Sequence, residues 1–595
     1  THDAPLAELA LASETSLEDL IETLNRSQLH LTGQGPLPIA GVDGKVKGEL
    51  KIAMPLISDA KVSKIEGHAR ISDIRGKSED YQLTVQGGAV DIEVSDIGVI
   101  AKGDLSVNGV MARLHMHRIL DAPSHLQPPI RISSTLDNAD RRQLGLDVNH
   151  LVQGEIAAEI TISHTEAGEN AVHVQADLTN AELIIEELAW RKLPGRQANV
   201  QFDLDVPSPN RTELNNFKVV GDMIALDGWI VANEKRDLVE YAFPNFSLNV
   251  VSRLDVRGKV DKKKIWKVTA KGSTFDAKDL FRSLLALGKT VDHSIAPAEP
   301  AVGVDLTAQI DTVLGHSDVS LRNYSVKLSQ RNGQLVSLDG RGTLDGGEPF
   351  AVVMTSGGAR RFYAESTDAG QTFKLVGFYP NMQGGRMRLE VDLEARGEAE
   401  KSGTLWVEDF RVLGDPIISE VYSSADGGSG GRSEGRQRKG EREVFEFQLL
   451  RVPFSVGHGQ FVLGDSQIRG PLLGASIRGR VDYNTQRLSL GGTYVPLQGI
   501  NSAFCDIPLF GPIVSGLDCQ GVFGITYAIQ GPMARPQVLV NPLSMLTPGI
   551  FRGIMEMTSP NPQVQPLREQ QTKGPASSRV RASSSAPAST VDGWS

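Results

Sequence analysis

Residues 45–52 alternate strictly between polar and apolar side chains, and this period of two constrains the fold more than any other feature of the sequence. Val46, Leu50 and Ile52 fall on one face of an extended segment, and Lys45, Lys47, Glu49 and Lys51 fall on the other. A strand of this kind buries one face and leaves the other in water. The pattern therefore predicts a half-exposed β-sheet.

The same alternation returns along most of the chain. Further examples are 81–86, 90–94, 172–178, 200–206, 246–250, 304–310, 324–328 and 387–393. Short turn sequences such as Gly87-Gly88, Asn332-Gly333 and Asp345-Gly346 separate the segments and favour antiparallel meanders. The apolar face could pack on a second sheet or curl into a groove. The length of the meander favours the groove, so we predict a mainly β fold, an elongated and curled antiparallel sheet with a few short capping helices.

A few segments are expected to be helical. Ser16 and Asp19 resemble a capping box within an N-terminal helical segment, 1–30. Further helices are expected at 137–144, at 276–287 and after Asp415-Pro416. Asn541-Pro542 should begin a terminal apolar helix, whose apolar positions are Leu543, Leu546, Ile550, Phe551 and Ile554.

Composition divides the chain further. Residues 31–423 form the repetitive β-region, 424–443 are a Gly/Ser-rich charged insertion predicted to be disordered, 444–557 are a second β-region with the terminal helix, and 558–595 are a Ser/Pro-rich tail predicted to be disordered. Cys505 and Cys519 are too few for a disulfide scaffold. They are either bridged, in an oxidising compartment, or two buried free thiols.

Charge and hydropathy exclude several classes of function. The formal net charge of −11 over 595 residues argues against nucleic acid as the main partner. No apolar run is long enough to span a bilayer, and the chain opens without a signal peptide or an initial Met. We therefore expect a processed or partial chain whose N-terminal membrane anchor lies outside this sequence.

No catalytic constellation emerges, and we predict neither an enzyme nor a cofactor or metal site. Phosphate-binding loops, dinucleotide fingerprints and HExxH are missing from the sequence. Gly464-Asp465-Ser466 is similar to a lipase nucleophile motif, but no His follows it, and we interpret it as a hairpin turn. His115 and His117 share one strand face and are expected to be a surface pair.

The C-terminal β-region resembles the C-terminal domain of AsmA-like proteins of Gram-negative bacteria. The matching segments, in order, are Gly459–Phe461, Gly470–Ser476, Gly491–Pro496, Asn501, Ile507–Gly511, Gly521–Tyr527, Gly531–Pro532, Pro536, Val538–Ser544 and Pro548–Arg552. Upstream, Ala181–Leu183 and Leu188–Gly195 are similar to the middle region of that family, with Lys-Leu-Pro-Gly where the family usually has Lys-Pro-Pro-Gly.

The resemblance implies a periplasmic protein, anchored in the inner membrane, whose β-groove carries phospholipid acyl chains toward the outer membrane. The expected groove-lining residues are Val46, Leu50, Ile52, Leu83, Val85, Val174, Leu204, Leu248, Leu306, Val326, Leu389 and Val391. Phospholipids, the two membranes and other envelope proteins would be its partners. The alternative is a non-enzymatic β-repeat envelope protein that assists outer-membrane protein assembly.

Overall fold

The computed structural model describes residues 6–26, 40–55, 64–78, 83–120, 122–167, 169–285, 303–355, 360–394, 401–415, 418, 443–471, 473–496, 525–533 and 535–541. Residues 424–442 of the insertion, Cys505, Cys519, the predicted terminal helix from Pro542 on and the tail lie outside these residues.

The strands of the first half are β1 Leu6–Ser16, β2 Ala40–Pro55, β3 Lys64–Ser78, β4 Leu83–Ser95, β5 Gly98–Val107, β6 Val110–Ile119, β7 Ile130–Leu136, β8 Val152–Gln153, β9 Ile156–His164, β10 Asn170–Asp177, β11 Glu182–Ile185, β12 Trp190–Lys192, β13 Ala198–Ser208, β14 Arg211–Gly221, β15 Ile224–Asn233, β16 Leu238–Leu248, β17 Arg253–Val260 and β18 Ile265–Asp276. Those of the second half are β19 Gly303–Leu314, β20 Ser320–Arg331, β21 Gln334–Leu344, β22 Pro349–Thr355, β23 Arg361–Ser366, β24 Met382–Asp392, β25 Lys401–Leu413, β26 Val444–Gly457, β27 Gln460–Arg469, β28 Leu473–Asp482, β29 Arg487–Pro496, β30 Ile525–Pro532 and β31 Gln537–Asn541. The helices are α1 Leu17–Arg26, η1 Ser124–Leu126, α2 Asn138–Gln143, η2 Glu186–Leu188, α3 Lys278–Leu285 and α4 Ala369–Val376.

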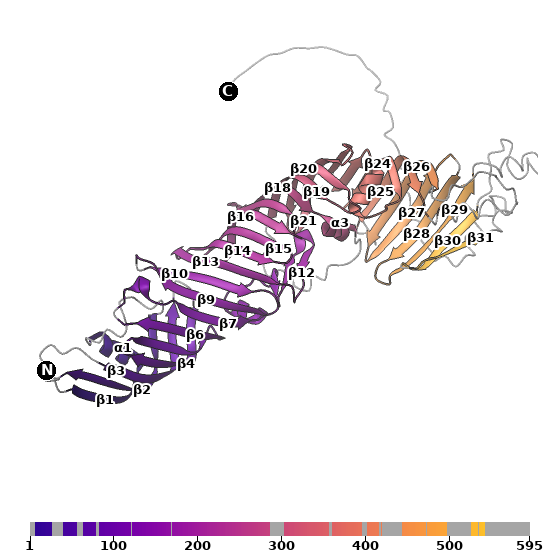
Figure 1. Cartoon of the computed structure of the whole chain (residues 1–595). Helices are drawn as coiled ribbons and strands as arrows, with labels where there is room; N and C mark the ends of the chain where they lie inside the picture. The colour runs from indigo at the N-terminus through magenta and orange to yellow at the C-terminus, as the bar shows by residue number, and fades with distance from the viewer. Residues whose placement is uncertain are drawn as a thin grey trace, which may run out of the picture.

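The described strands form one 28-stranded sheet and one 3-stranded sheet. The large sheet runs in chain order from β1 to β31 as an elongated ribbon of strands (Figure 1). The small sheet has the order β12-β11-β8. In the sequence, β8 lies between β7 and β9 of the large sheet, and β11 and β12 lie between β10 and β13. The predicted class, a mainly β fold built on one long antiparallel sheet, is confirmed.

The meander is broken at one point among the described strands, where β18 and β19 pair in parallel. A parallel pair needs a crossover connection, and this one contains α3. The expectation of a purely antiparallel meander is therefore wrong here. Alternation within each strand is the same for both pairings, so it could not reveal the crossover.

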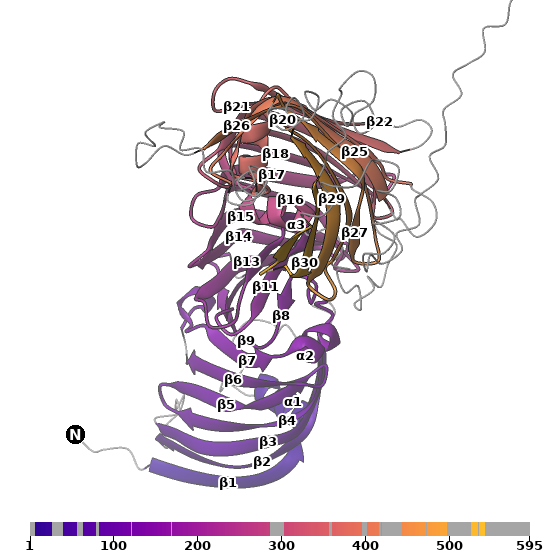
Figure 2. The same ribbon diagram turned by 90° about the vertical axis from the view of Figure 1, so that its right-hand side faces the viewer.

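The large sheet is curled, with one concave face along its length (Figure 2). Register shifts accompany the curl, including those at Asn216 and Asn323, whose φ angles are 50°. Such left-handed residues mark bulges, which bend a strand and increase its twist. Gly87-Gly88 lies in such a shift inside β4, so its interpretation as a turn between two strands is wrong.

Helices α1–α4, η2 and the small sheet lie along one long edge of the large sheet, whereas η1 lies at the opposite edge, between β6 and β7. The first of these edges, which we call the capped rim, contains the carboxyl ends of β7, β10, β18 and β23, after which α2, β11, α3 and α4 begin. α1 begins at the same rim, after β1. Figure 2 shows α1, α2, β8, β11 and α3 following one another along the molecule. The opposite edge is called the open rim.

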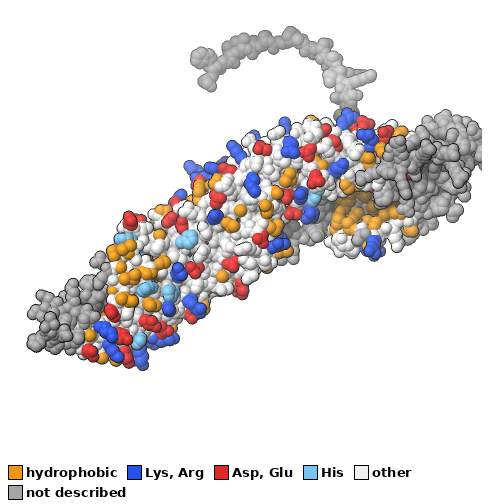
Figure 3. All heavy atoms as spheres, in the orientation of Figure 1, with side chains coloured by type: hydrophobic (Ala, Val, Ile, Leu, Met, Phe, Trp, Pro, Cys, Tyr) orange, Lys and Arg blue, Asp and Glu red, His pale blue; other side chains and the backbone are white. Residues whose placement is uncertain are grey.

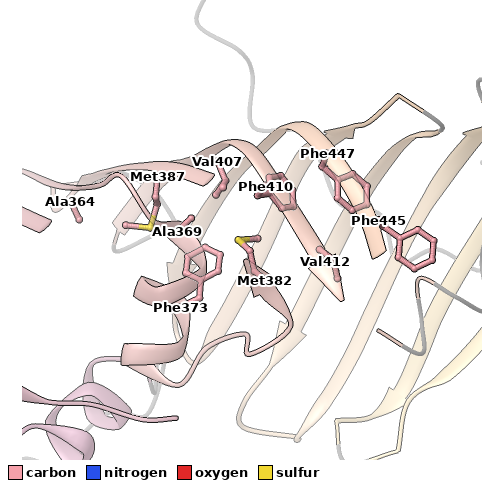
Figure 4. Packing of buried hydrophobic residues seen from close by; sticks show 10 residues of the cluster. All are labelled: Ala364, Ala369, Phe373, Met382, Met387, Val407, Phe410, Val412, Phe445 and Phe447. Carbon is pink, nitrogen blue, oxygen red and sulfur yellow. The ribbon is translucent and has the colours of Figure 1, made fainter. Parts of the chain in front are cut away.

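Fully buried side chains gather toward the capped rim. In Figure 4, Phe373 of α4 points toward Met382 and Met387, while Phe410 and Phe447 stack with ring centroids 5.1 Å apart. A helix covers this part of the concave face, so water is excluded from it. The core is thus a strip along one rim rather than the whole concave face.

Local signals placed the starts of α1, α2 and α3 correctly, whereas α4 was not predicted. The helix expected after Asp415-Pro416 lies almost wholly outside the described residues. The Ser16 hydroxyl donates to the Asp19 carboxylate at 2.7 Å, and Asp19 N donates back to Ser16 Oγ at 3.1 Å. Asp137 and Asp140 form a full capping box at α2. The segment 1–30 is not helical throughout, however, since β1 precedes α1 and pairs with β2.

Candidate functional site: the apolar inner face

The concave face carries a continuous row of apolar side chains that crosses the large sheet from strand to strand. Its members occupy matching register positions and include no charged residue. We call it the first apolar row; it comprises Val46, Ile71, Val90, Gly103, Leu114, Ile132, Ile160, Val174, Phe202, Phe217, Gly228, Phe243, Val256, Ala270, Ala308, Val326, Gly340, Val352, Ala364, Leu389, Leu405 and Val452.

A second apolar row runs beside the first, two residues nearer the open rim. Each member is the direct cross-strand partner of the next. The row comprises Ile130, Ile162, Val172, Leu204, Leu214, Ile230, Tyr241, Gly258, Val268, Leu306, Leu328, Leu338, Met354, Phe362, Val391, Gly403, Phe454, Leu463, Gly479, Leu490, Ile529 and Val538.

The two rows give the molecule an apolar surface far longer than a core needs. Neighbouring strands are about 4.8 Å apart, so the first row extends over about 100 Å from β2 to β26. We call the face that bears both rows the inner face. Most row members outside the glycines and the capped-rim core are only partly buried, for example Leu114, Val174, Leu306 and Val326. Partly exposed apolar residues in a continuous strip mark an interaction surface.

The predicted lining residues all lie on the inner face, but they divide into two groups. Leu50, Leu83, Val174, Leu204, Leu306, Val326, Leu389 and Val391 are partly exposed. Val46, Ile52, Val85 and Leu248 are buried, with exposed fractions of 4%, 6%, 7% and 2%. Val46 and Val85 pack with Leu17 of α1, and Leu248 packs with Trp190 of β12. These three are held by the protein's own core, so the surface left for a ligand is the exposed group.

The opposite, outer face is polar and carries the ion pairs between strands. Arg70 and Asp91 are 3.1 Å apart, and Arg361 and Glu390 are 3.2 Å apart. Charged side chains are scattered over this face, whereas hydrophobic side chains gather on the recessed surface beside β27 (Figure 3). A hollow of about 870 Å³ at β6–β13 also lies on the outer face, lined by polar groups such as Arg113, Glu159 and Gln175. The two faces therefore differ sharply in chemistry.

A strap formed by residues 137–155 and 178–197 covers part of the inner face. It contains α2, the small sheet and η2, and two buried cations fix it. Lys192 is fully buried, and its Nζ donates to the carbonyl oxygens of Ala181 at 2.9 Å and Arg196 at 2.8 Å. Burial lowers the pKa of Lys192. Arg141, 1% exposed, donates to the carbonyl oxygens of Leu136, Val152 and Gly154.

An aromatic cluster on the inner face went unrecognised in the sequence. Phe202, Phe217, Phe243, Tyr241 and Trp266 form a chain of neighbouring rings, which we call the aromatic belt. Each ring sits at an apolar position of its own alternating strand, so each was visible singly. Their proximity depends on the register and bulges of β13–β18, which the sequence did not specify.

The motifs considered as catalytic lie in regular strands. Ser466 is fully buried inside β27, where its hydroxyl donates to the carbonyl oxygen of Gly464 at 3.1 Å. Since β27 runs through this position with a register shift, the interpretation as a hairpin turn is wrong. His115 and His117 share the outer face of β6, as the alternation predicts.

The described residues contain no group of three or more His, Cys, Asp or Glu side chains placed to hold a metal ion. Their helices also include none with the length and apolar character required to cross a membrane. No protein-family model and no curated protein matches the sequence.

Proposed function

We propose that this protein is a non-enzymatic lipid carrier whose inner face holds the acyl chains of phospholipids. The observation that carries the proposal is the pair of uncharged, partly exposed apolar rows running from one end of the large sheet toward the other. Contact between such a strip and water is unfavourable, and the packing of the protein's own core does not require it. A continuous exposed apolar strip therefore indicates a bound apolar partner.

Acyl chains match this surface in chemistry. Each CH₂ group moved from water to an apolar surface gains about 0.8 kcal/mol, so a chain lying along the rows is retained without any charged anchor. The headgroup stays at the open rim, which the strap and helices leave uncovered over much of the sheet. Movement along the rows breaks and makes equivalent contacts, so it needs no catalytic residue.

The proposal extends to location and partners. A surface of about 100 Å suits a bridge between two membranes better than a carrier that encloses one lipid. Together with the resemblance to AsmA-like proteins, this favours a periplasmic protein, anchored to the inner membrane, that supplies phospholipid to the outer membrane. Nucleic acid is not an expected partner.

Photocrosslinking tests the proposal directly. A photoreactive side chain at Leu50 or Val391, on the inner face, should form phospholipid adducts in protein purified in mild detergent. The matched outer-face positions Lys51 and Arg388 should not. Native mass spectrometry of the unmodified protein should show bound phospholipid.

Equal and low adduct yields on both faces, with no lipid in the native spectrum, would overturn the proposal. Capture of outer-membrane proteins by such lipid-free protein would favour the alternative role in outer-membrane protein assembly.

A further inference from the structure

The aromatic belt lies along the inner face over β13–β18, between two stretches of the first apolar row that are aliphatic. Ring centroids are 5.8 Å apart for Phe202 and Phe217, 5.9 Å for Phe217 and Phe243, 5.4 Å for Phe243 and Tyr241, and 5.4 Å for Tyr241 and Trp266. On one side lie the first-row residues of β2–β10, and on the other those of β17–β26. The belt therefore occupies row positions across β13–β18, and the first apolar row is aliphatic on either side of it.

Glycines on the intervening strands allow these rings to meet. Phe217 on β14 and Phe243 on β16 are two strands apart, about 9.6 Å between backbones. Gly228 of β15 is the register partner of Phe217 and lies against the backbone of Phe243. On β17, Gly258 is the partner of Tyr241, and a Cβ there would come within 2.4 Å of the Tyr241 ring. Aromatic rings thus occupy space that side chains of β15 and β17 would otherwise fill.

The strap lies over the inner face in the region of the aromatic belt. Trp190 of β12 is 3% exposed and donates from Nε1 to the side-chain oxygen of Asn249 at 3.0 Å, which fixes the strap to the end of β16. Leu188 of η2 packs against two hydrophobic clusters, one of which also packs against Phe217 and Phe243 of the belt. Burial raises the pKa of the Tyr241 phenol, and the nearby Glu187 carboxylate raises it further.

A further contact joins the two rims. Arg236 lies in the turn between β15 and β16, at the open rim, and its guanidinium donates to the carbonyl oxygen of Leu144, which follows α2 of the strap. Because α2 starts from the capped rim, the strap extends from one rim to a contact with the other. The loop beyond it exposes Leu146, Val148 and Leu151. The inner face is thus bridged in the region of the belt.

We propose that the aromatic belt and the strap form a waist that divides the inner face into two acyl-chain compartments and limits passage between them. This inference rests on the proposed lipid-carrier function. Stacked rings stand higher than aliphatic side chains and are held by their neighbours, so an acyl chain must pass between the belt and the strap.

Lipid exchange measured on both sides of the belt tests the waist. The full chain, with a photoreactive side chain at Leu114 or at Val326, is loaded from vesicles of deuterated phosphatidylethanolamine and phosphatidylglycerol. It is then mixed with unlabelled vesicles and irradiated at intervals, and the mass of the adduct reports how much label remains. Separate compartments should lose label at rates that differ by about tenfold, which corresponds to about 1.4 kcal/mol in barrier height.

Variants identify the barrier. Phe217→Leu with Phe243→Leu should bring the two rates together, and Arg236→Ala should do so in part. Phe454 stacks on Phe461 outside the belt, with ring centroids 5.3 Å apart. Phe454→Leu should therefore leave the difference between the two exchange rates unchanged. Circular dichroism and thermal unfolding verify the fold, and the single variant Phe243→Leu serves if the double variant is unstable.

The outcomes separate the two proposals. Equal rates at both positions in the unmodified protein, or unequal rates that persist in every belt and strap variant, would overturn the waist while leaving the lipid carrier intact. A lack of lipid adducts at either position would instead overturn the carrier function on which the waist rests.

Discussion

Lys192 shows how one buried side chain can hold a whole covering element in place. Its ammonium group reaches four carbonyl oxygens, those of Thr179, Ala181, Leu193 and Arg196, at 2.8–3.4 Å, and no carboxylate is among these hydrogen-bond partners. The contacts connect the two ends of the β11–β12 hairpin. A buried cation with this many acceptors is a structural clamp, which stabilises the strap only as long as all partners are present.

Lys192→Met should therefore loosen the strap without unfolding the large sheet. The apolar part of the side chain is retained, but the carbonyl groups lose their donor, at a cost of about 2–4 kcal/mol. Hydrogen exchange should accelerate in residues 178–197 and remain unchanged in β24–β26. Lys218→Met, at an exposed position on the outer face of β14, is the control. Equal protection of the strap in both variants would contradict the clamp.

Asp305 predicts a defined acid sensitivity. Lys267 Nζ lies 2.6 Å from Oδ2 of Asp305, and Arg331 Nη2 lies 2.7 Å from Oδ1 as an ion-pair contact rather than a directed hydrogen bond. The hydrogen bond from Lys267, aided by Arg331, lowers the pKa of Asp305 to about 2. The ordinary value is about 3.9. Folding thus favours the ionised carboxylate across the parallel β18–β19 pair.

Because the folded-state pKa is the lower one, this stabilisation is fully present above about pH 4 and is lost as the pH falls toward 2. Asp305→Asn should lower the free energy of unfolding by about 1 kcal/mol at neutral pH, since the partly exposed Lys267 is screened by solvent. Thermal unfolding should show the difference between the two proteins shrinking between pH 4 and pH 2. A difference that stays constant over this range would exclude the Asp305 ion pairs as its cause.

At the scale of the elements, alternation in the sequence determines which face each strand residue occupies but not how distant strands meet. Val46, Val174 and Val326 were all placed on the apolar face, because a period of two holds for any strand pairing. The parallel β18–β19 pair, the register shift at Gly87-Gly88 and the passage of β27 through Ser466 escaped prediction. Each depends on register, which is set by contacts between strands rather than within them.

The same reasoning explains why the burial of the lining residues was predicted unevenly. Val46 and Leu50 lie on one face of β2, yet Val46 is covered by α1 and Leu50 is partly exposed. Which part of a strand a helix covers depends on where the chain leaves the sheet. That exit is always the capped rim for the described helices α1–α4, a regularity visible only once the strands are paired.

Helix α4 should stabilise the second half of the sheet through Leu375. Its side chain is fully buried and packs with Leu321 and Leu344 at the capped rim. Leu375→Ala should cost about 2–5 kcal/mol, because the sheet beneath cannot collapse to fill the cavity. Hydrogen exchange should quicken in β19–β21, while β2–β5 remain protected. Lys374→Ala, which removes a neighbouring side chain outside this core, should change neither region. Uniform loss of protection along the chain would contradict a local role.

At the scale of the whole molecule, continuity of the inner face is the property on which the proposed lipid-carrier function depends. The two apolar rows are assembled from strands that each contribute one or two side chains, so no single residue binds a ligand strongly. A carrier of this design tolerates conservative substitution almost anywhere. It should be sensitive to any change that places a charge in a row, since a charge holds water where an acyl chain must lie.

Val326→Glu and Lys327→Glu test this with neighbouring residues on opposite faces of β20. Val326 lies in the first apolar row between Ala308 and Gly340, while Lys327 is exposed on the outer face. Both variants introduce the same carboxylate into the same strand, and only the first interrupts the row. Loss of contact with about two CH₂ groups weakens lipid retention by about tenfold. Native mass spectrometry should therefore show depleted lipid in Val326→Glu and unchanged lipid in Lys327→Glu. Equal lipid content in two folded variants would mean that lipids are bound elsewhere than along the first apolar row.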